Sequence, residues 1–257
     1  MNKNITSNNI YAQPNLYDDI MWWKKDDIQF WRNIIQKTQA KKILELCCGT
    51  GRLSMPLIND GIDYYGIDSS ISFTNHLKDK LLKNNYDSNK IICEDIKNFK
   101  LNQSFDLIFI SFNSLAHLLE DKDALACFQS VINHMHDKSI FGIDIFVPSP
   151  LFLYRDSTEK INIMDFVDSE NNEKLHILES TNYDFNTEIN HIHWEFLNNH
   201  GINKFSYSFD MRMFFPDTLN KLLIDSNYYI QQLYGDYDFS DFHENSDKQI
   251  YLCAKHI

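Results

Sequence analysis

The chain has 257 residues, and its 24 Lys and Arg against 36 Asp and Glu give a formal net charge of −12. Hydrophobic residues make up 43% and charged residues 23%, a composition typical of globular rather than disordered proteins. The negative charge argues against a duplex nucleic-acid partner, because phosphate neutralisation supplies most of that affinity. At ~150 residues per domain, the length predicts one large domain or one domain with an insertion.

Targeting signals and cysteine usage point to the cytoplasm. No apolar stretch approaches the ~20 residues that a membrane helix needs, and residues 1–10 lack the apolar core of a secretory signal. The five cysteines are odd in number and spread along the chain, which fits neither a disulfide framework nor a metal knuckle. We therefore expect reduced thiols in a cytoplasmic protein.

The N-terminal part is predicted to be helical after a short leader. Residues 1–15 are rich in Asn, and we expect a mobile leader there. Between Leu16 and Gln36, apolar residues recur at helical spacing and are interrupted by charged residues 24–27. The pattern predicts two short helices, the second starting at Asp26 or Asp27, where a carboxylate suits a helix N-terminus.

A strict alternation of apolar runs and helical patterns follows. Runs of this kind, separated by helices, predict a mostly parallel sheet covered on both faces. The five predicted strands are 42–46, 64–67, 90–93, 105–110 and 139–147.

From Pro148 onward the pattern changes, and apolar and polar residues alternate with period two within segments. The clearest are 189–196 and 205–213, with a turn between them at 198–201. This predicts an antiparallel patch inserted into the α/β domain. A helix over 216–226, with Pro at its start, and strands at 228–234 and 249–255 complete the α/β pattern.

These elements predict a Rossmann-like α/β sheet with an antiparallel last strand and an inserted antiparallel β patch. We expect three regions, which are a helical cap over 1–40, a core over 41–147 and 214–257, and a lid over 148–213.

The motif that carries chemistry lies between the first predicted strand and its helix. It reads Glu45-Leu-Cys-Cys-Gly-Thr-Gly-Arg52, and small residues there let the backbone approach a ligand. Asp68 ends the second strand, where a carboxylate can accept both hydroxyls of a ribose. Glu94 and Asp95 end the third strand, within reach of an adenine amine. Three successive strand ends thus predict one ligand crevice.

With these residues in place, the sequence resembles the class I S-adenosylmethionine-dependent methyltransferases, in their small-molecule branch. The match rests on the glycine motif 44–52, the ribose acid in 66–70, the adenine segment 94–96 and the fourth strand with its loop, 105–117. One departure is Cys47, which stands where the family has its first glycine. Because cysteine is small, we expect the turn to survive.

The resemblance implies S-adenosyl-L-methionine as cofactor and assigns residues to its parts. Glu45, Gly49 and Gly51 would line the methionine part, and Asp68 would hold the ribose. For Arg52, contact with the cofactor carboxylate and a simple surface ion pair both stay open. The full set implied to bind the cofactor is Tyr17, Trp22 (or Trp23), Glu45, Cys47, Gly49, Thr50, Gly51, Arg52, Asp68, Ser69, Asp95, Ile96, Ser111 and Phe112.

Histidines supply the other candidates. His117 follows the fourth strand, where family substrates meet the methyl group, and could deprotonate an attacking amine or hydroxyl; an orienting or core role is the alternative. His191, His193 and Glu195 share one strand face and could bind a metal. A solvated face is the preferred interpretation, so we expect no metal.

The function predicted is transfer of a methyl group to an N or O atom of a small molecule by in-line displacement. Residues 111–114 lack the Asn/Asp-Pro-Pro-Tyr/Phe signature of adenine and glutamine-amide methylation. A nicotinamide-dependent oxidoreductase is an alternative, although the sixth position from Gly49 is Ser54 instead of Gly or Ala. A non-catalytic cofactor-binding scaffold is another. We expect a monomer or homodimer without nucleic-acid or membrane partners.

Overall fold

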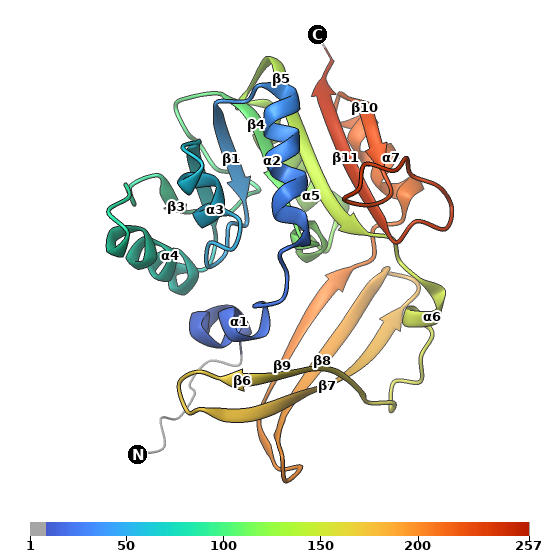
Figure 1. The fold of residues 1–257 in the computed structure, drawn as a ribbon. Coiled ribbons are helices and arrows are strands. Elements are labelled where there is room, and N and C mark those ends of the chain that lie inside the picture. Colours follow the sequence, from blue (N-terminus) through green and yellow to red (C-terminus); the bar gives the residue numbers. More distant parts are fainter. Residues whose placement is uncertain (1–8, 257) are drawn as a thin grey trace.

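The computed structural model describes residues 9–256, which form a three-layer α/β body and a second, smaller sheet (Figure 1). The large sheet has seven strands in the order β10-β11-β5-β4-β1-β2-β3. Its strands are β1 (Lys42–Leu46), β2 (Asp63–Asp68), β3 (Ile91–Cys93), β4 (Phe105–Ile110), β5 (Met135–Phe146), β10 (Tyr228–Tyr234) and β11 (Lys248–Lys255). β1 to β5 pair in parallel, and β11 runs antiparallel to both of its neighbours. The predicted Rossmann-like sheet with an antiparallel last strand is confirmed.

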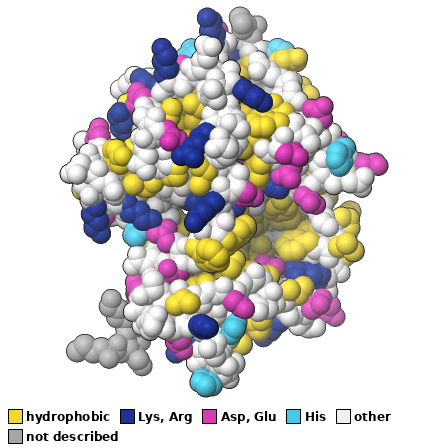
Figure 2. Space-filling view, viewed as in Figure 1, with side chains coloured by type: hydrophobic (Ala, Val, Ile, Leu, Met, Phe, Trp, Pro, Cys, Tyr) yellow, Lys and Arg dark blue, Asp and Glu magenta, His cyan; other side chains and the backbone are white. Residues whose placement is uncertain are grey.

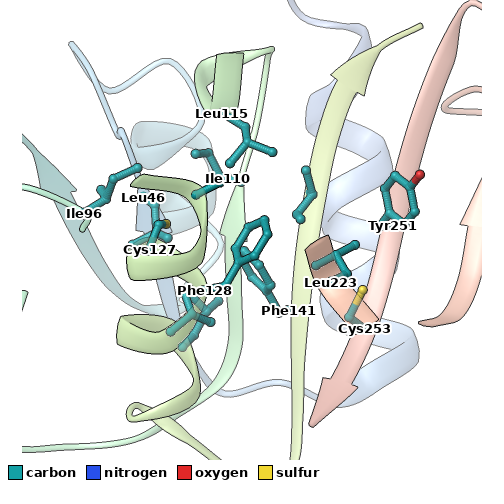
Figure 3. Close-up of a cluster of buried hydrophobic side chains, with 14 of the residues drawn as sticks. Leu46, Ile96, Ile110, Leu115, Cys127, Phe128, Phe141, Leu223, Tyr251 and Cys253 are labelled. Carbon is teal, nitrogen blue, oxygen red and sulfur yellow. The ribbon is translucent and has the colours of Figure 1, made fainter. Parts of the chain in front are cut away.

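Helices cover both faces of the large sheet. One face packs on α2 (Asp26–Thr38), α3 (Ser54–Asn59) and α4 (Ile71–Lys83), and the other on α5 (Asp121–Ile132) and α7 (Pro216–Asp225). On the second of these faces, Phe128 of α5 packs with Phe141 of β5, and Leu223 of α7 belongs to the same buried cluster (Figure 3). Strands buried on both faces explain why they read as continuous apolar runs instead of alternating ones.

The inserted segment forms its own antiparallel sheet, in the order β6-β7-β8-β9, below the body in Figure 1. Its strands are β6 (Ile161–Asp168), β7 (Glu173–Asp184), β8 (Ile189–Asn198) and β9 (Asn203–Arg212), and the short helix α6 (Pro150–Leu153) leads into it. The predicted antiparallel patch is therefore present. We call it the inserted sheet.

The N-terminal segment differs from its expected form. Residues 1–8 of the expected leader lie outside the described part of the chain, but η1 (Ile10–Ala12) is a 3-10 helix, and Ile10 is only 2% exposed. Ile10 packs with Ile20, at the end of α1 (Pro14–Ile20), against Phe196 and Tyr207 of the inserted sheet. The predicted leader was wrong for this stretch, because its few apolar side chains have a partner far along the chain.

The expected helical cap also divides into two parts. Phe30 and Trp31 of α2 are buried against the large sheet, with Trp31 stacked on Phe109 at 4.4 Å between ring centroids. α1 contacts β6 of the inserted sheet instead. α2 is thus a core helix of the body, and the segment 9–21, containing η1 and α1, is the part that covers the site. We call 9–21 the N-terminal segment.

The strand order fixes where a ligand can bind. The chain runs outward through β1, β2 and β3, then returns to pair β4 on the other side of β1. Ligands of open α/β sheets bind at such a reversal, outside the carboxyl ends of the strands. No helix within residues 9–256 has the length and apolar character that a membrane span requires.

Candidate active site

A cavity of 710 Å³ opens at this reversal, between the body, the N-terminal segment and the inserted sheet. In Figure 2 the surface is hollowed between the body and the inserted sheet, and hydrophobic side chains gather around the hollow. Gly49 and Asp68 line it from the body, Tyr17 from α1, and Trp194 and Phe209 from the inserted sheet. A concave, mostly apolar cavity of this size with a few converging polar groups is typical of a small-molecule site.

The loop after β1 forms the tight turn that the motif predicts. Cys47, Gly49 and Gly51 have φ values of 58°, 56° and 94°, in the left-handed region where glycine is favoured. The loop is fixed to the next strand because the backbone N–H of Cys48 donates to the carbonyl of Ile67 at 2.9 Å. The turn survives with cysteine in place of the first glycine, as expected, although Cys47 adopts a conformation that L side chains rarely take.

Asp68 ends β2 and connects the loops after β1 and β2 at the body side of the cavity. One carboxylate oxygen accepts from the backbone N–H of Gly49 at 2.9 Å, and the other from that of Ser70 at 2.8 Å. Burial raises the pKa of Asp68, and these two hydrogen bonds oppose the shift. Since each carboxylate oxygen has a second lone pair, the group can still accept two hydroxyl donors from the cavity.

Glu45 is buried behind the loop and does not line the cavity. Its carboxyl accepts from the Tyr64 hydroxyl at 2.5 Å, and its other oxygen lies 3.5 Å from the Ser111 hydroxyl. Burial raises the pKa of Glu45 to about 8, against the opposing hydrogen bond from Tyr64. Glu45 thus ties β1 to β2 and β4 beneath the turn.

Arg52 forms a buried ion pair with the start of α2. Its guanidinium donates to both carboxylate oxygens of Asp27, at 2.5 and 2.8 Å, and Asp27 is fully buried. The guanidinium also lies 5.1 Å from the centre of the Phe112 ring, and the Lys24 ammonium lies 5.3 Å from it. Of the two roles left open for Arg52, the structure has an ion pair, but a buried one that fixes α2 to the loop.

The structure brings part of the predicted cofactor set to the cavity wall. Those that line it are Tyr17, Cys47, Gly49, Asp68, Ser69 and Phe112. Those that do not are Trp22, Glu45, Thr50, Gly51, Arg52, Asp95, Ile96 and Ser111. Trp22 is 61% exposed, and Asp95 contacts Lys97, so both point elsewhere. Ile96 and Ser111 are buried beneath the site.

His117 lines the cavity and contacts a residue that sequence reasoning missed. Its Nε2 lies 2.9 Å from the hydroxyl of Tyr11 in the N-terminal segment. Burial lowers the pKa of His117, which favours the neutral imidazole, and burial raises the pKa of Tyr11. His117 comes from η2 (Ser114–His117), directly after β4. The pair therefore joins the N-terminal segment to the body at the carboxyl end of β4.

The wall that the inserted sheet contributes to the cavity was also missed. Glu179 of β7 and Trp194 of β8 are cross-strand partners on the inner face of the inserted sheet, and both line the cavity. A signal was present in the sequence: Leu175, Ile177, Glu179 and Thr181 share one face by period two, so a carboxylate stands on an otherwise buried row. A buried acid in such a row suggests a specific partner.

The histidines on the outer face of the inserted sheet each have a partner other than a metal. His191 pairs with Asp210 at 2.7 Å, His193 contacts the Ser208 hydroxyl at 2.8 Å, and Glu195 pairs with Lys160 at 2.6 Å. Across residues 9–256, no cluster of three metal-ligating side chains is found.

Comparison with known proteins supports what the site geometry indicates. Residues 43–138 match the family model "Methyltransferase domain". A glycine/sarcosine N-methyltransferase of Aphanothece halophytica is 27% identical over 130 residues, which cover 46% of this chain and 47% of that protein. The chain thus matches about half the length of this curated relative.

Solved structures share the fold over nearly the whole chain. An S-adenosylmethionine-dependent methyltransferase from Clostridium acetobutylicum superposes with a TM-score of 0.79 at 19% identity, covering 97% of this chain and all of that one. The CcbJ methyltransferase of Streptomyces caelestis gives 0.77 at 19% identity over 91% and 99%. The sugar N-methyltransferase KedS8 of a Streptoalloteichus species gives 0.70 at 16% identity over 91% and 89%.

Residues 43–138 therefore match a methyltransferase domain, and the chain as a whole has the fold of solved S-adenosylmethionine-dependent methyltransferases. This confirms the family resemblance seen in the glycine motif and the strand-end acids.

Proposed function

We propose that the protein is an S-adenosylmethionine-dependent methyltransferase that acts on an N or O atom of a small molecule. The observation that carries the proposal is one cavity in which the glycine loop and Asp68, within the matched domain, face His117 and the inserted sheet. Neither the oxidoreductase nor the non-catalytic alternative has a comparable observation in its favour.

The residues at the cofactor end fit S-adenosylmethionine by their chemistry. Asp68 is buried, lines the cavity and keeps free lone pairs for a ribose diol, and the strained Cys47–Gly49 turn lets the backbone approach a ligand closely. When bound, the cofactor supplies an activated methyl on a sulfonium. We propose that the residues already named from the cavity wall hold it, with Glu45, Thr50, Gly51, Arg52, Ser111 and Ile96 supporting them from behind.

The chain's own groups then position the acceptor and manage one proton. Because burial lowers the pKa of His117, its imidazole is neutral near pH 7 and can accept the proton that an attacking amine or hydroxyl loses. Tyr11 orients the ring through its hydroxyl. The N-terminal segment and the inserted sheet wall off the site on two sides, and alignment of the acceptor is most of what a preactivated methyl requires.

The cavity and its neighbours suggest the class of acceptor. Relatives include a glycine/sarcosine and a sugar N-methyltransferase, which act on small molecules by their names. We propose the same class here, with the protein working in the cytoplasm as a monomer or homodimer and without a nucleic-acid partner. The net charge of −12 supports the last point.

Calorimetric titration with S-adenosylhomocysteine, with NADH as the parallel ligand, tests the proposal. Micromolar binding of S-adenosylhomocysteine alone is the expected result. Binding of NADH alone would make the protein an oxidoreductase, and binding of neither would leave a scaffold whose turn at Cys47 no longer admits a nucleotide.

A further inference from the structure

The acceptor side of the cavity carries a carboxylate and lacks a cationic side chain. Within residues 9–256, no Lys or Arg lines the cavity, and the two carboxylates that line it are Asp68 and Glu179. Asp68 lies at the proposed cofactor end, so Glu179 is the charged side chain on the cavity wall at the inserted sheet. Its ion-pair partner, Arg155, does not line the cavity, so an anionic group placed there would approach the carboxylate with no lysine or arginine on the wall to receive it.

Two donors hold Glu179 in a fixed orientation. The indole N–H of Trp194 donates to one carboxylate oxygen at 3.0 Å, and the Arg155 guanidinium donates to the other at 2.9 Å. Arg155 approaches from behind, stacked over the Phe152 ring at 4.6 Å from its centre, and does not line the cavity. Glu179 is only 7% exposed, yet each oxygen can accept one more hydrogen bond from the cavity side.

Aromatic rings line the cavity together with this carboxylate. Trp194 and Phe209 meet edge to face, with centroids 5.0 Å apart and planes at 89°, and the Tyr11 ring lies 6.4 Å from Phe209. All three line the cavity. Aromatic faces attract cations, and rings grouped beside a carboxylate are the chemistry that recognises an ammonium group.

We propose that the acceptor is a small amine that carries no carboxylate or phosphate, and that Glu179 is the residue that selects it. This rests on the proposed function. The bound ammonium first gives one proton to His117 or to solvent, which frees the nitrogen lone pair. That lone pair forms the N–CH3 bond while the S–CH3 bond breaks with its electron pair left on sulfur, so one positive charge moves from sulfur to nitrogen. Glu179 accepts a hydrogen bond from the amino group, and its negative charge stabilises the positive charge that develops on the nitrogen.

A charge series on one skeleton tests this assignment by binding alone. The intact protein, saturated with S-adenosylhomocysteine, is titrated calorimetrically with benzylammonium, benzyl alcohol and benzoate. We expect benzylammonium to bind about tenfold or more tightly than the alcohol, the scale of a hydrogen bond to a charged group, and benzoate to bind weakest. Glu179→Gln should remove most of that preference while S-adenosylhomocysteine affinity stays the same.

The matched control is Glu195→Gln, on the outer face of the same sheet, where Glu195 pairs with Lys160; it should leave the series unchanged. If Glu179→Gln does not fold, as judged by its melting temperature, Glu179→Asp replaces it. The ligand preference of the wild-type protein then still tests the proposal. Benzylammonium binding no tighter than the alcohol, including no binding of either, overturns the assignment, and so does preferential binding of benzoate. Loss of S-adenosylhomocysteine binding in the wild type would instead refute the proposed function beneath it.

Discussion

Tyr11 and His117 are 106 positions apart in the chain, and their side chains meet at 2.9 Å inside the cavity. Their rings lie edge to face, with centroids 5.2 Å apart. The carbonyl of Tyr11 also accepts a hydrogen bond from the Ser70 hydroxyl, next to the turn that holds Asp68. One residue of the N-terminal segment therefore touches both the candidate base and the cofactor end of the site.

Tyr11→Phe keeps the ring and removes this hydrogen bond. We expect kcat to fall about tenfold, because His117 loses its orienting partner, while the Kd for S-adenosylhomocysteine changes by less than about twofold. Burial lowers the pKa of His117. The acid limb of the wild-type pH–rate profile should therefore have its midpoint below 6.5, the ordinary pKa of a histidine side chain. Steady-state kinetics across pH measures both.

The control for that experiment is Tyr229→Phe, at an exposed position on β10, which should leave kinetics unchanged.

His117→Ala should slow methyl transfer more strongly than Tyr11→Phe, without loss of cofactor affinity. If turnover of the true acceptor is unaffected by His117→Ala, the histidine has a structural role only.

Asp68→Ala should weaken S-adenosylhomocysteine binding by about 1–3 kcal/mol, the scale of charge-assisted hydrogen bonds lost with one partner. Asp63→Ala, at the other end of the same strand, where Asp63 pairs with Lys90, is the matched control. Calorimetry on both variants separates the two positions. An unchanged dissociation constant for Asp68→Ala would remove this carboxylate from the cofactor site.

Gly51→Ala should destabilise the fold more than Gly61→Ala. Both glycines have positive φ, 94° and 82°, so both variants carry backbone strain. A Cβ at Gly51 would overlap the Leu77 side chain of α4, whereas nothing lies within 4 Å of one at Gly61. Overpacking of this kind costs about 1–3 kcal/mol, and denaturant unfolding should show that difference. Equal losses of unfolding free energy in the two variants would mean that Leu77 and α4 move to accommodate the added Cβ without destabilising the fold.

The two bidentate arginine–aspartate pairs should differ sharply in their contribution to stability. Asp27→Ala leaves Arg52 without its buried partner and should cost about 3–5 kcal/mol. Asp60→Ala breaks the corresponding contact to Arg32, where both side chains are more than a third exposed, and should cost about 0–1 kcal/mol. Urea unfolding of the two variants provides the comparison, and similar losses would contradict the role of burial.

Stability should fall as pH rises from about 4.5 to about 8, in part because of Glu45. Its pKa is about 8 in the folded protein against 4.5 in the unfolded chain, so the folded state binds more protons across this window. The free energy of unfolding then decreases with pH, by at most about 1.4 kcal/mol per pH unit for one such group. Glu45→Gln keeps an acceptor for Tyr64 and should flatten the slope, which unfolding curves at several pH values can measure.

The body of the fold was predictable because its strands are buried on both faces and its helices alternate with them. The expected strand at 105–110 matches β4 residue for residue, and the helix at 216–226 matches α7 to within one residue. Asp68 and His117 could be placed because strand ends of a parallel sheet share one edge. Tyr11 could not, because the short segment around it is rich in Asn and shows no clear periodicity, and its partner His117 lies far along the chain.

Glu45 and Arg52 illustrate a different limit. The motif fixes which residues gather around the turn, but it does not say which of them face the cavity. Burial of Glu45 under Tyr64 and pairing of Arg52 with Asp27 depend on side chains contributed by β2 and α2. Such choices between facing a ligand and supporting the loop arise from tertiary packing, which a local pattern does not contain.

The shared packing of the N-terminal segment and the inserted sheet sets a rule for exchanging parts between related proteins. Ile10 and Ile20 are buried against Phe196 and Tyr207, so the two segments form one hydrophobic unit although about 140 residues of other structure separate them. A chimera that transplants residues 148–213 alone would leave that unit mismatched on one side. If segments are exchanged to transfer acceptor preference, residues 9–21 must be exchanged together with the inserted sheet.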